Sequence, residues 1–171
     1  GSAYEGGIRV PMIVKWPGTI KPGTTCGSYL IIEDFFPSIL EMAGIRNYKT
    51  VQPIDGKSFV PLLKGTGNRS KGRNLYWNYP NLWGNEGPGI DPTCTIRSGD
   101  WKLIYYYQTG EKELFNIRND IGEKQNLTAQ HQAIVKKLSK DLGQYLRKVK
   151  AQRPTFKSTG KSCPWPDENK N

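Results

Sequence analysis

Residues 93–107 read TCTIRSGDWKLIYYY, a stretch typical of two strands joined by a tight turn. Thr93–Ser98 and Trp101–Tyr107 are rich in β-branched and aromatic residues, which favour strands. Gly99 and Asp100 form a two-residue connection with glycine first, which is typical of a type II′ turn. The stretch therefore predicts an antiparallel hairpin.

Two further strands flank this hairpin. Leu75–Tyr79 precedes it across a loop rich in glycine and proline at residues 81–91, and Glu113–Asn116 follows it after a turn at residues 108–111. Short connections between consecutive strands favour antiparallel neighbours. The sequence therefore predicts a four-stranded antiparallel meander.

A long helix is predicted after the meander, from Ala129 to about Gln152, with Thr128 as its cap and Pro154 as its limit. An isolated small sheet must bury one face, so we expect this helix to lie across the meander. Residues 155–171 are expected to be a loop-like tail. The apolar stripe of the helix is predicted to be Ile134, Leu138, Leu142, Tyr145 and Val149.

The first part of the chain has a different pattern. Ile8–Val14 is almost wholly apolar without alternation, which predicts a strand buried on both faces, and Tyr29–Ile32 predicts a second short extended segment. Asp34 is expected to cap a helix that ends at Gly44, and a short helix is expected at Ser58–Lys64. One parallel strand cannot form a core, so these elements suggest the end of a larger sheet.

The predicted fold class is α+β. Residues 66–73 are polar and lack periodicity, so we place a boundary there. We expect residues 1–65 to be the end of a large α/β domain, residues 66–154 to be a smaller domain, and residues 155–171 to be the tail. This organisation predicts the C-terminal part of a longer protein.

Composition excludes several kinds of site. The chain has 171 residues and one histidine, His131, and its three cysteines are far apart at positions 26, 94 and 163. A zinc site of cysteines and histidines, or a nucleophile paired with histidine, is therefore not expected. No apolar run approaches the roughly 20 residues of a membrane-spanning helix.

The net charge of +10 favours an anionic partner. The densest basic stretch, residues 136–150, falls in the predicted helix, where such charges usually form the solvated face. We therefore expect no nucleic-acid partner, although a polyanion-binding surface remains an alternative.

Aromatic and amide residues gather at one segment: Trp77, Asn78, Tyr79, Asn81 and Trp83. Stacking aromatic rings and amide hydrogen bonds are what carbohydrate binding uses. Packing beneath the helix is an equally open interpretation for Trp77 and Tyr79. We predict that Asn78, Asn81 and Trp83 bind substrate, and we predict no catalytic and no metal-binding residue.

Two charged motifs have plain structural interpretations. The run from Glu5 through two glycines to Arg9 is typical of a tight turn with an ion pair, although it could face a polar site. Asp120 and Glu123 do not have calcium-loop spacing. They are expected to accept backbone hydrogen bonds in the loop before the helix.

Several phrases together resemble the type I, formylglycine-dependent sulfatase family, in the same order as in arylsulfatases. The resemblance covers about residues 1–153. Its phrases are YEGGIRVP (4–11), WPG (16–18), DFFPSIL (34–40), IRSGDWKLI (96–104), ELFN (113–116) and DIGEKQNL (120–127).

The resemblance implies a fold and an activity. Sulfatases have a large α/β domain, similar to that of alkaline phosphatase, followed by a smaller domain with a four-stranded antiparallel sheet and a long helix. They hydrolyse sulfate esters with a formylglycine made from Cys or Ser in a C/S-x-P-x-R motif, assisted by calcium. That motif and the calcium ligands are absent here, as is the active-site lysine that the family places just before the residue matching Gly1.

One departure from the family concerns specificity. Many relatives have His-Tyr-Pro-His where this chain has Asn78-Tyr79-Pro80-Asn81, a segment that the family lends to the rim of the substrate cleft. Amides at both positions favour contacts with neutral sugar hydroxyls.

We therefore predict the C-terminal part of a sulfatase, a sulfuric ester hydrolase acting on a sulfated glycan or aryl sulfate. The part itself is expected to be inactive and without cofactor, whereas the parent uses calcium and formylglycine. Its partners would be the upstream catalytic portion, the substrate, and a second copy through exposed residues 8–14. The resemblance implies a periplasmic or secreted enzyme; the alternative is a stand-alone carbohydrate- or polyanion-binding module.

Overall fold

The structure is a computed structural model that describes residues 2–67, 72–82, 84 and 90–168. It divides into two compact units, one made of residues 1–10 and 74–171 and the other of residues 11–73. These units differ from the predicted ranges, because residues 1–10 pack with the later part of the chain. The assignment of residues 1–65 to a larger domain stays a prediction.

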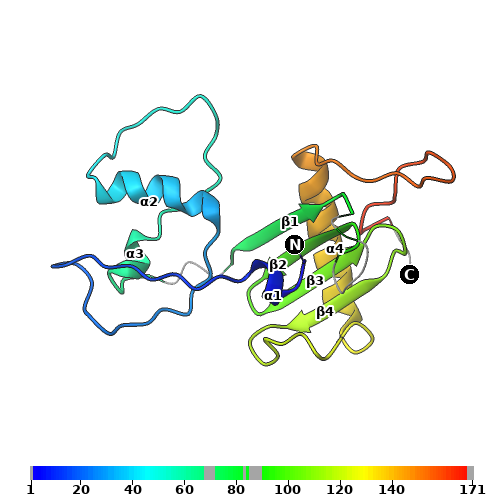
Figure 1. Cartoon of the computed structure of the whole chain (residues 1–171), viewed down its shortest axis with the longest axis horizontal. Helices are drawn as coiled ribbons and strands as arrows, with labels where there is room; N and C mark the ends of the chain where they lie inside the picture. Colours follow the sequence, from blue (N-terminus) through cyan, green and yellow to red (C-terminus); the bar gives the residue numbers. More distant parts are fainter. Residues whose placement is uncertain (1, 68–71, 83, 85–89, 169–171) are drawn as a thin grey trace. The chain divides into compact units, whose positions relative to one another are not determined.

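The first unit is built on a four-stranded antiparallel sheet (Figure 1), which confirms the predicted meander and fold class. The strands follow one another in the order of the sequence. They are β1 (Asn74–Tyr79), β2 (Thr93–Ser98), β3 (Trp101–Tyr106) and β4 (Lys112–Asn116).

The hairpin between β2 and β3 is the one predicted. Ser98 pairs with Trp101, and Gly99 has a φ of +59° while Asp100 does not lie in the left-handed region. A positive φ confined to the first turn residue is the requirement of a type II′ turn.

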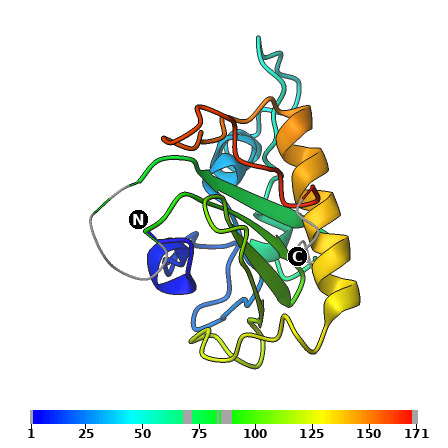
Figure 2. The same cartoon turned by 90° about the vertical axis from the view of Figure 1, so that its right-hand side faces the viewer.

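Helix α4 (Gln132–Lys148) runs along one face of the sheet (Figure 2). It is shorter than predicted, and His131 rather than Thr128 stands at its N-cap. The Thr128 hydroxyl instead donates to the Lys112 carbonyl at 3.1 Å. The helix ends before Lys150, which adopts a left-handed φ of 51°.

The buried stripe of α4 is also displaced from the prediction. Leu138 and Leu142 are buried as expected, but Val149 is 49% exposed. Apolar residues lie on two adjacent faces of the helix. The face that packs against the sheet and the tail is the buried one. Its buried members are Val135, Leu138, Ser139, Leu142, Gly143 and Leu146.

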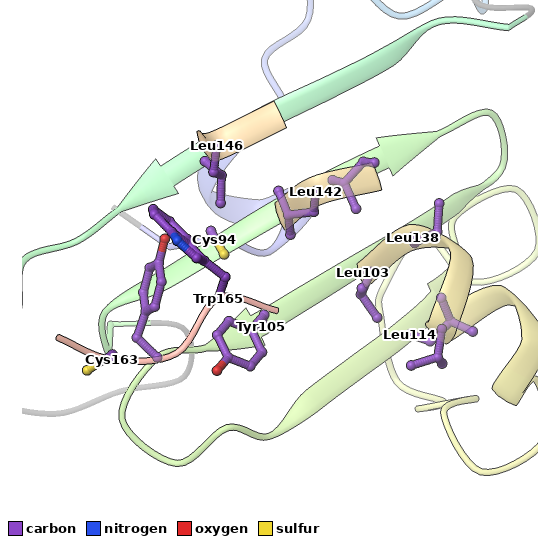
Figure 3. Packing of buried hydrophobic residues seen from close by; sticks show 12 residues of the cluster. Cys94, Leu103, Tyr105, Leu114, Leu138, Leu142, Leu146, Cys163 and Trp165 are labelled. Carbon is purple, nitrogen blue, oxygen red and sulfur yellow. The ribbon is translucent and has the colours of Figure 1, made fainter. Parts of the chain in front are cut away.

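The core lies between the sheet, α4 and the last residues of the chain (Figure 3). Leu103 and Leu114 from the strands meet Leu138 and Leu142 from the helix. Residues 155–168 are not a free tail, since they contribute Cys163 and Trp165 to this core. The helical Gly143 permits this packing, because a methyl group there would collide with the Asp167 carboxylate.

The predicted strand at Ile8–Val14 is wrong. Residues 5–8 form the single-turn helix α1 (Glu5–Ile8), and residues 9–16 have no regular structure. A strand needs a neighbour for its backbone hydrogen bonds, and none of the described strands lies beside this segment. The segment is nonetheless exposed as expected, with Val10 82% and Ile13 97% accessible.

The second unit contains η1 (Ile32–Asp34), α2 (Phe35–Met42) and α3 (Val60–Leu63). Gly44 ends α2 with a φ of +77°, as predicted. Asp34 stands at the N-cap position of α2 as predicted, but its carboxylate makes no capping hydrogen bond and instead accepts hydrogen bonds from the Lys57 amide and Arg73. The extended segment predicted at Tyr29–Ile32 forms no strand, and its last residue opens η1. In the described part of the chain, no helix is long and apolar enough for a membrane crossing.

Candidate functional site

The predicted substrate-binding segment begins within β1 and continues past its end. Trp83 lies outside the described residues. Asn81 is exposed just beyond the end of the strand. Asn78 lies within β1 and is half-buried.

The side chain of Asn78 is hydrogen-bonded within the chain at both of its ends. Its Nδ2 donates to the Gln152 carbonyl at 2.7 Å, and its Oδ1 accepts from the Tyr107 hydroxyl at 2.8 Å. These bonds connect β1 to Gln152, which follows α4, and to Tyr107, which follows β3. The structure thus gives Asn78 a role in holding the segment, and a sugar contact would use its remaining donor and acceptor capacity.

The aromatic residues of β1 face two ways, because successive side chains of a strand alternate. Tyr76 stacks on Tyr145 of α4, with ring centroids 3.7 Å apart and planes 6° from parallel. Trp77 and Tyr79 therefore project from the opposite face of the sheet, where both are half-buried. Packing beneath the helix, one interpretation of these two residues, is wrong for both.

That opposite face holds a cluster of buried charges that the sequence did not reveal. Lys102, in the middle of the sheet, is fully buried, and its Nζ lies 3.1 Å from Glu5 Oε1 and 2.8 Å from Glu123 Oε1. Arg97 Nη1 and Arg9 Nη1 each lie 3.3 Å from Glu5 Oε2. We call Glu5, Arg97, Lys102 and Glu123 the charge cluster.

The charge cluster joins three separate parts of the sequence. Glu5 comes from α1, Arg97 and Lys102 from paired positions of β2 and β3, and Glu123 from the loop after β4. Glu123 Oε2 also accepts a hydrogen bond from the backbone amide of Glu5 at 2.5 Å. The ion pair expected between Glu5 and Arg9 is confirmed, but it is the exposed edge of this larger arrangement.

The loop carrying Glu123 is shaped for this contact. Glu123 adopts a left-handed φ of 52°, which costs a residue with a Cβ roughly 1 kcal/mol or more. Asp120 accepts a hydrogen bond from the Gln125 amide at 2.8 Å. The prediction that both acids accept backbone hydrogen bonds is confirmed, with the partner of Glu123 more than 100 residues away in the chain.

A second set of contacts holds the residue before Glu5. The Tyr4 hydroxyl donates to Glu113 Oε2 at 2.6 Å and lies 3.0 Å from the Tyr106 hydroxyl, which also donates to Glu113. Burial and the hydrogen bond to Glu113 raise the pKa of Tyr4 to about 12. Ala3 is fully buried against Phe115 and its neighbours, so residues 3–5 are fixed along the sheet.

A separate buried ion pair organises the second unit. Asp34 is fully buried and accepts two hydrogen bonds of 2.6 Å from the Arg73 guanidinium. Burial alone would raise the pKa of Asp34, but hydrogen bonds from Arg73 and from the Lys57 and Ile31 amides outweigh it and lower that pKa. The pair closes a loop of the chain from η1 to the last residue of the unit.

The nucleophilic and metal-ligating side chains of the described residues are dispersed. No group of three or more His, Cys, Asp or Glu side chains among them could hold a metal ion. Cys94 is fully buried, and burial raises the pKa of its thiol well above the ordinary value. The His131 ring packs against Trp101 at 4.9 Å between centroids. The arrangement can bind and position, but it offers no activated nucleophile.

Comparison with known proteins shows which proteins this chain resembles. Residues 2–152 match the family described as N-sulphoglucosamine sulphohydrolase, C-terminal. A sulfatase of Formosa agariphila is 32% identical over 181 residues, covering 99% of this chain and 32% of that protein. Human arylsulfatase A is 32% identical over 146 residues, covering 84% of this chain and 27% of that protein.

Solved structures agree with this match. The crystal structure of Ps i-CgsB has a TM-score of 0.71 with 26% identity, covering 85% of this chain and 30% of that one. The structure of BT4656 in complex with its substrate D-glucosamine-2-N,6-O-disulfate has a TM-score of 0.51 with 25% identity, covering 68% of this chain and 24% of that one. The chain thus spans at most about a third of these relatives.

Proposed function

Because this chain belongs to the family of N-sulphoglucosamine sulphohydrolase C-terminal regions, within the sulfatases, we propose that it is the C-terminal part of an enzyme that hydrolyses sulfate esters. The match over residues 2–152 carries this proposal. The chain contributes the smaller domain and the rim of the substrate cleft, whereas bond cleavage takes place in an upstream catalytic portion of the same protein.

The residues present support the assignment of bond cleavage to the upstream portion. Cys94 lacks the motif from which formylglycine is made and is buried, and the buried acidic residues Glu5 and Asp34 are held in ion pairs. In the parent enzyme, calcium and formylglycine would supply the electrophilic and nucleophilic chemistry. The described residues do not fit either group, so the proposal assigns both to the upstream portion.

The proposed substrate is a sulfated carbohydrate. Relatives named for such substrates include an N-acetylglucosamine-6-O-sulfatase of Bacteroides thetaiotaomicron, 29% identical over 155 residues covering 87% of this chain and 26% of that protein. We assign sugar contacts to Asn81 and Trp83, with Asn78 holding the segment through its bonds to Gln152 and Tyr107 and offering its remaining hydrogen-bonding capacity. Export to the periplasm or the cell exterior accords with a substrate of this kind.

The substrate class can be tested with two substrates in the full-length protein. Trp83→Ala should lower kcat/KM for a sulfated oligosaccharide tenfold or more, since a stacking ring and its neighbouring hydrogen bonds contribute roughly 2–3 kcal/mol. Hydrolysis of a small chromogenic aryl sulfate should change little, because that ester does not reach the rim. Leu82→Ala, at an exposed neighbouring position, is the matched control.

Equal losses on the two substrates would mean that Trp83 supports the fold rather than a sugar. Binding of sulfated polysaccharide by a full-length protein that releases no sulfate from either substrate would favour the stand-alone binding module.

A further inference from the structure

The charge cluster has no role in the proposed sugar contacts: Arg97 pairs with Leu75 near the start of β1, whereas Asn78 lies near the end of that strand. We infer that Glu5, Lys102 and Glu123 are positioning residues: they anchor residues 2–9 to the sheet and thereby fix the upstream catalytic portion for sulfate-ester hydrolysis. The inference rests on the proposed function for its catalytic consequence, whereas the anchor itself rests on the geometry alone.

Burial of these charges is costly unless they serve a specific arrangement. Lys102 is fully buried and Glu5 is 4% exposed, so both have lost their hydration. Apolar side chains of similar size would usually be at least as stabilising at such positions. What the charges add is a fixed geometry, since each carboxylate oxygen of Glu5 has its own cationic partner.

The backbone is adapted to the same contact on both sides. Glu123 holds a left-handed conformation while its carboxylate receives the Glu5 amide and Lys102. Gly7 allows α1 to fold back closely, because a Cβ at that position would collide with the backbone of Ser2. A merely solvated turn would need neither adaptation.

The segment is attached at two adjacent residues that contact different strands. Glu5 is held over β2 and β3 by Arg97 and Lys102, and Tyr4 is held at β4 by Glu113. Two neighbouring attachments fix the direction of the chain as well as its position. Residues within three positions upstream of the anchor are then confined to roughly 10 Å of it, at 3.3–3.6 Å per residue.

In the proposed enzyme, the catalytic portion enters the smaller domain through this segment. Displacements of about 1 Å in a catalytic arrangement can reduce rates on the order of a hundredfold. Loosening the anchor should therefore reduce turnover even though none of its residues touches the substrate.

The test uses the full-length protein and the variant Lys102→Met, which leaves Glu5 and Glu123 without their shared cation. Lys137→Met is the matched control, because Lys137 forms an ion pair with Asp141 on the exposed surface of α4. Amide hydrogen exchange of residues 2–9 reports the anchor. The kcat for an aryl sulfate, taken per folded molecule well below the unfolding temperature, reports positioning, and loss of stability alone does not change it.

Lys102→Met should accelerate exchange at residues 5–9 tenfold or more and lower kcat at least tenfold, while Lys137→Met changes both by less than twofold. The double variant Lys102→Met/Glu123→Gln removes one charge of each sign, so it should fold more readily than Lys102→Met. It still lacks the contact between Lys102 and Glu5, so exchange at residues 5–9 should accelerate and kcat should fall at least tenfold in this variant too. If Lys102→Met does not accumulate as a folded protein, the double variant is measured in its place.

Faster exchange with unchanged kcat in a folded variant would overturn the positioning role, and unchanged exchange would overturn the anchor. A wild-type protein without any sulfate-ester turnover would instead refute the proposed function, and its exchange data would still decide the anchor.

Discussion

Lys102 Nζ lies 3.1 Å from Glu5 Oε1, although the two residues are 97 positions apart in the sequence. This contact attaches the first residues of the chain to the centre of the antiparallel sheet. It explains why residues 1–10 pack with residues 74–171 rather than with residues 11–73, which follow them directly. The smaller domain of the proposed enzyme therefore includes a segment from before the second unit.

Gly143→Ala should destabilise the chain, although alanine favours helices over glycine by about 1 kcal/mol. The added methyl group would collide with Asp167, which forms an ion pair with Arg147 and belongs to the turn beside the buried Trp165. The Asp167 carboxylate must turn away and lose both of its contacts with Arg147, so we expect a net loss of about 1 kcal/mol or less in the free energy of unfolding in urea.

The double variant Gly143→Ala/Asp167→Ala removes the group that the methyl would meet. It should be more stable than Gly143→Ala alone. An increase of about 1 kcal/mol for the single variant would show that the tail does not dock on α4.

The second unit should lose stability in acid because of Asp34. The pKa of Asp34 is lowered in the folded chain, so its contribution is fully present above the unfolded value of about 3.9 and is lost as the pH falls through the folded pKa. The protection of the amides of residues 11–73, taken relative to an unfolded chain at the same pH, should therefore fall below about pH 4.

Asp34→Asn should reduce stability at neutral pH by about 3–5 kcal/mol, since it leaves the buried Arg73 without its counter-charge. Its stability should also depend less on pH in the acid range. The same acid dependence in wild type and variant would assign the effect to another group.

At high pH the critical group is Tyr4. Its pKa is raised to about 12, so its contribution is complete below the unfolded value of about 10 and disappears as the pH rises toward 12. The absorbance of tyrosinate near 295 nm should show a late titration step that Tyr4→Phe removes. At neutral pH this variant should cost about 1–2 kcal/mol through the hydrogen bond lost by Glu113. Loss of an ordinary step near about pH 10, with the late step unchanged, would contradict the contact.

The 171-residue chain by itself should self-associate through residues 8–14. Val10 and Ile13 are 82% and 97% exposed, and we propose that the upstream portion covers them in the parent enzyme. Light scattering should detect dimers or larger species, and Val10→Asp/Ile13→Asp should yield a monomer. A monomeric wild-type chain would show that this segment does not drive association.

Features set by neighbouring residues were predictable from the sequence. The hairpin at Gly99 and the end of α2 at Gly44 depend on turns that only a few residues specify, and both are confirmed. The apolar run at Ile8–Val14 forms no strand, because composition favours a strand without revealing whether a partner strand is present. The buried stripe of α4 differs from the predicted one because docking of the tail determines which face of the helix is buried. No local sequence pattern indicates that docking.

The charge cluster could not be predicted, since its members are brought together only by the fold. One signal was present: Lys102 stands alone in the otherwise apolar stretch WKLIYYY, where a buried cation needs a partner. The partners, Glu5 and Glu123, had been interpreted only through their local turns. Asn78 was recognised as an unusual position, but its bonds to Gln152 and Tyr107 emerge only from tertiary structure.

The central claim is that this chain completes a sulfatase without carrying its catalytic centre. Sulfate release from a chromogenic aryl sulfate, measured with calcium for the full-length protein and for the 171-residue chain at equal concentration, tests it most directly. We predict turnover by the full-length protein and none above buffer by the chain alone. Turnover by the chain alone that survives substitution of Cys26, Cys94 and Cys163 would contradict the claim, as would a full-length protein that releases no sulfate.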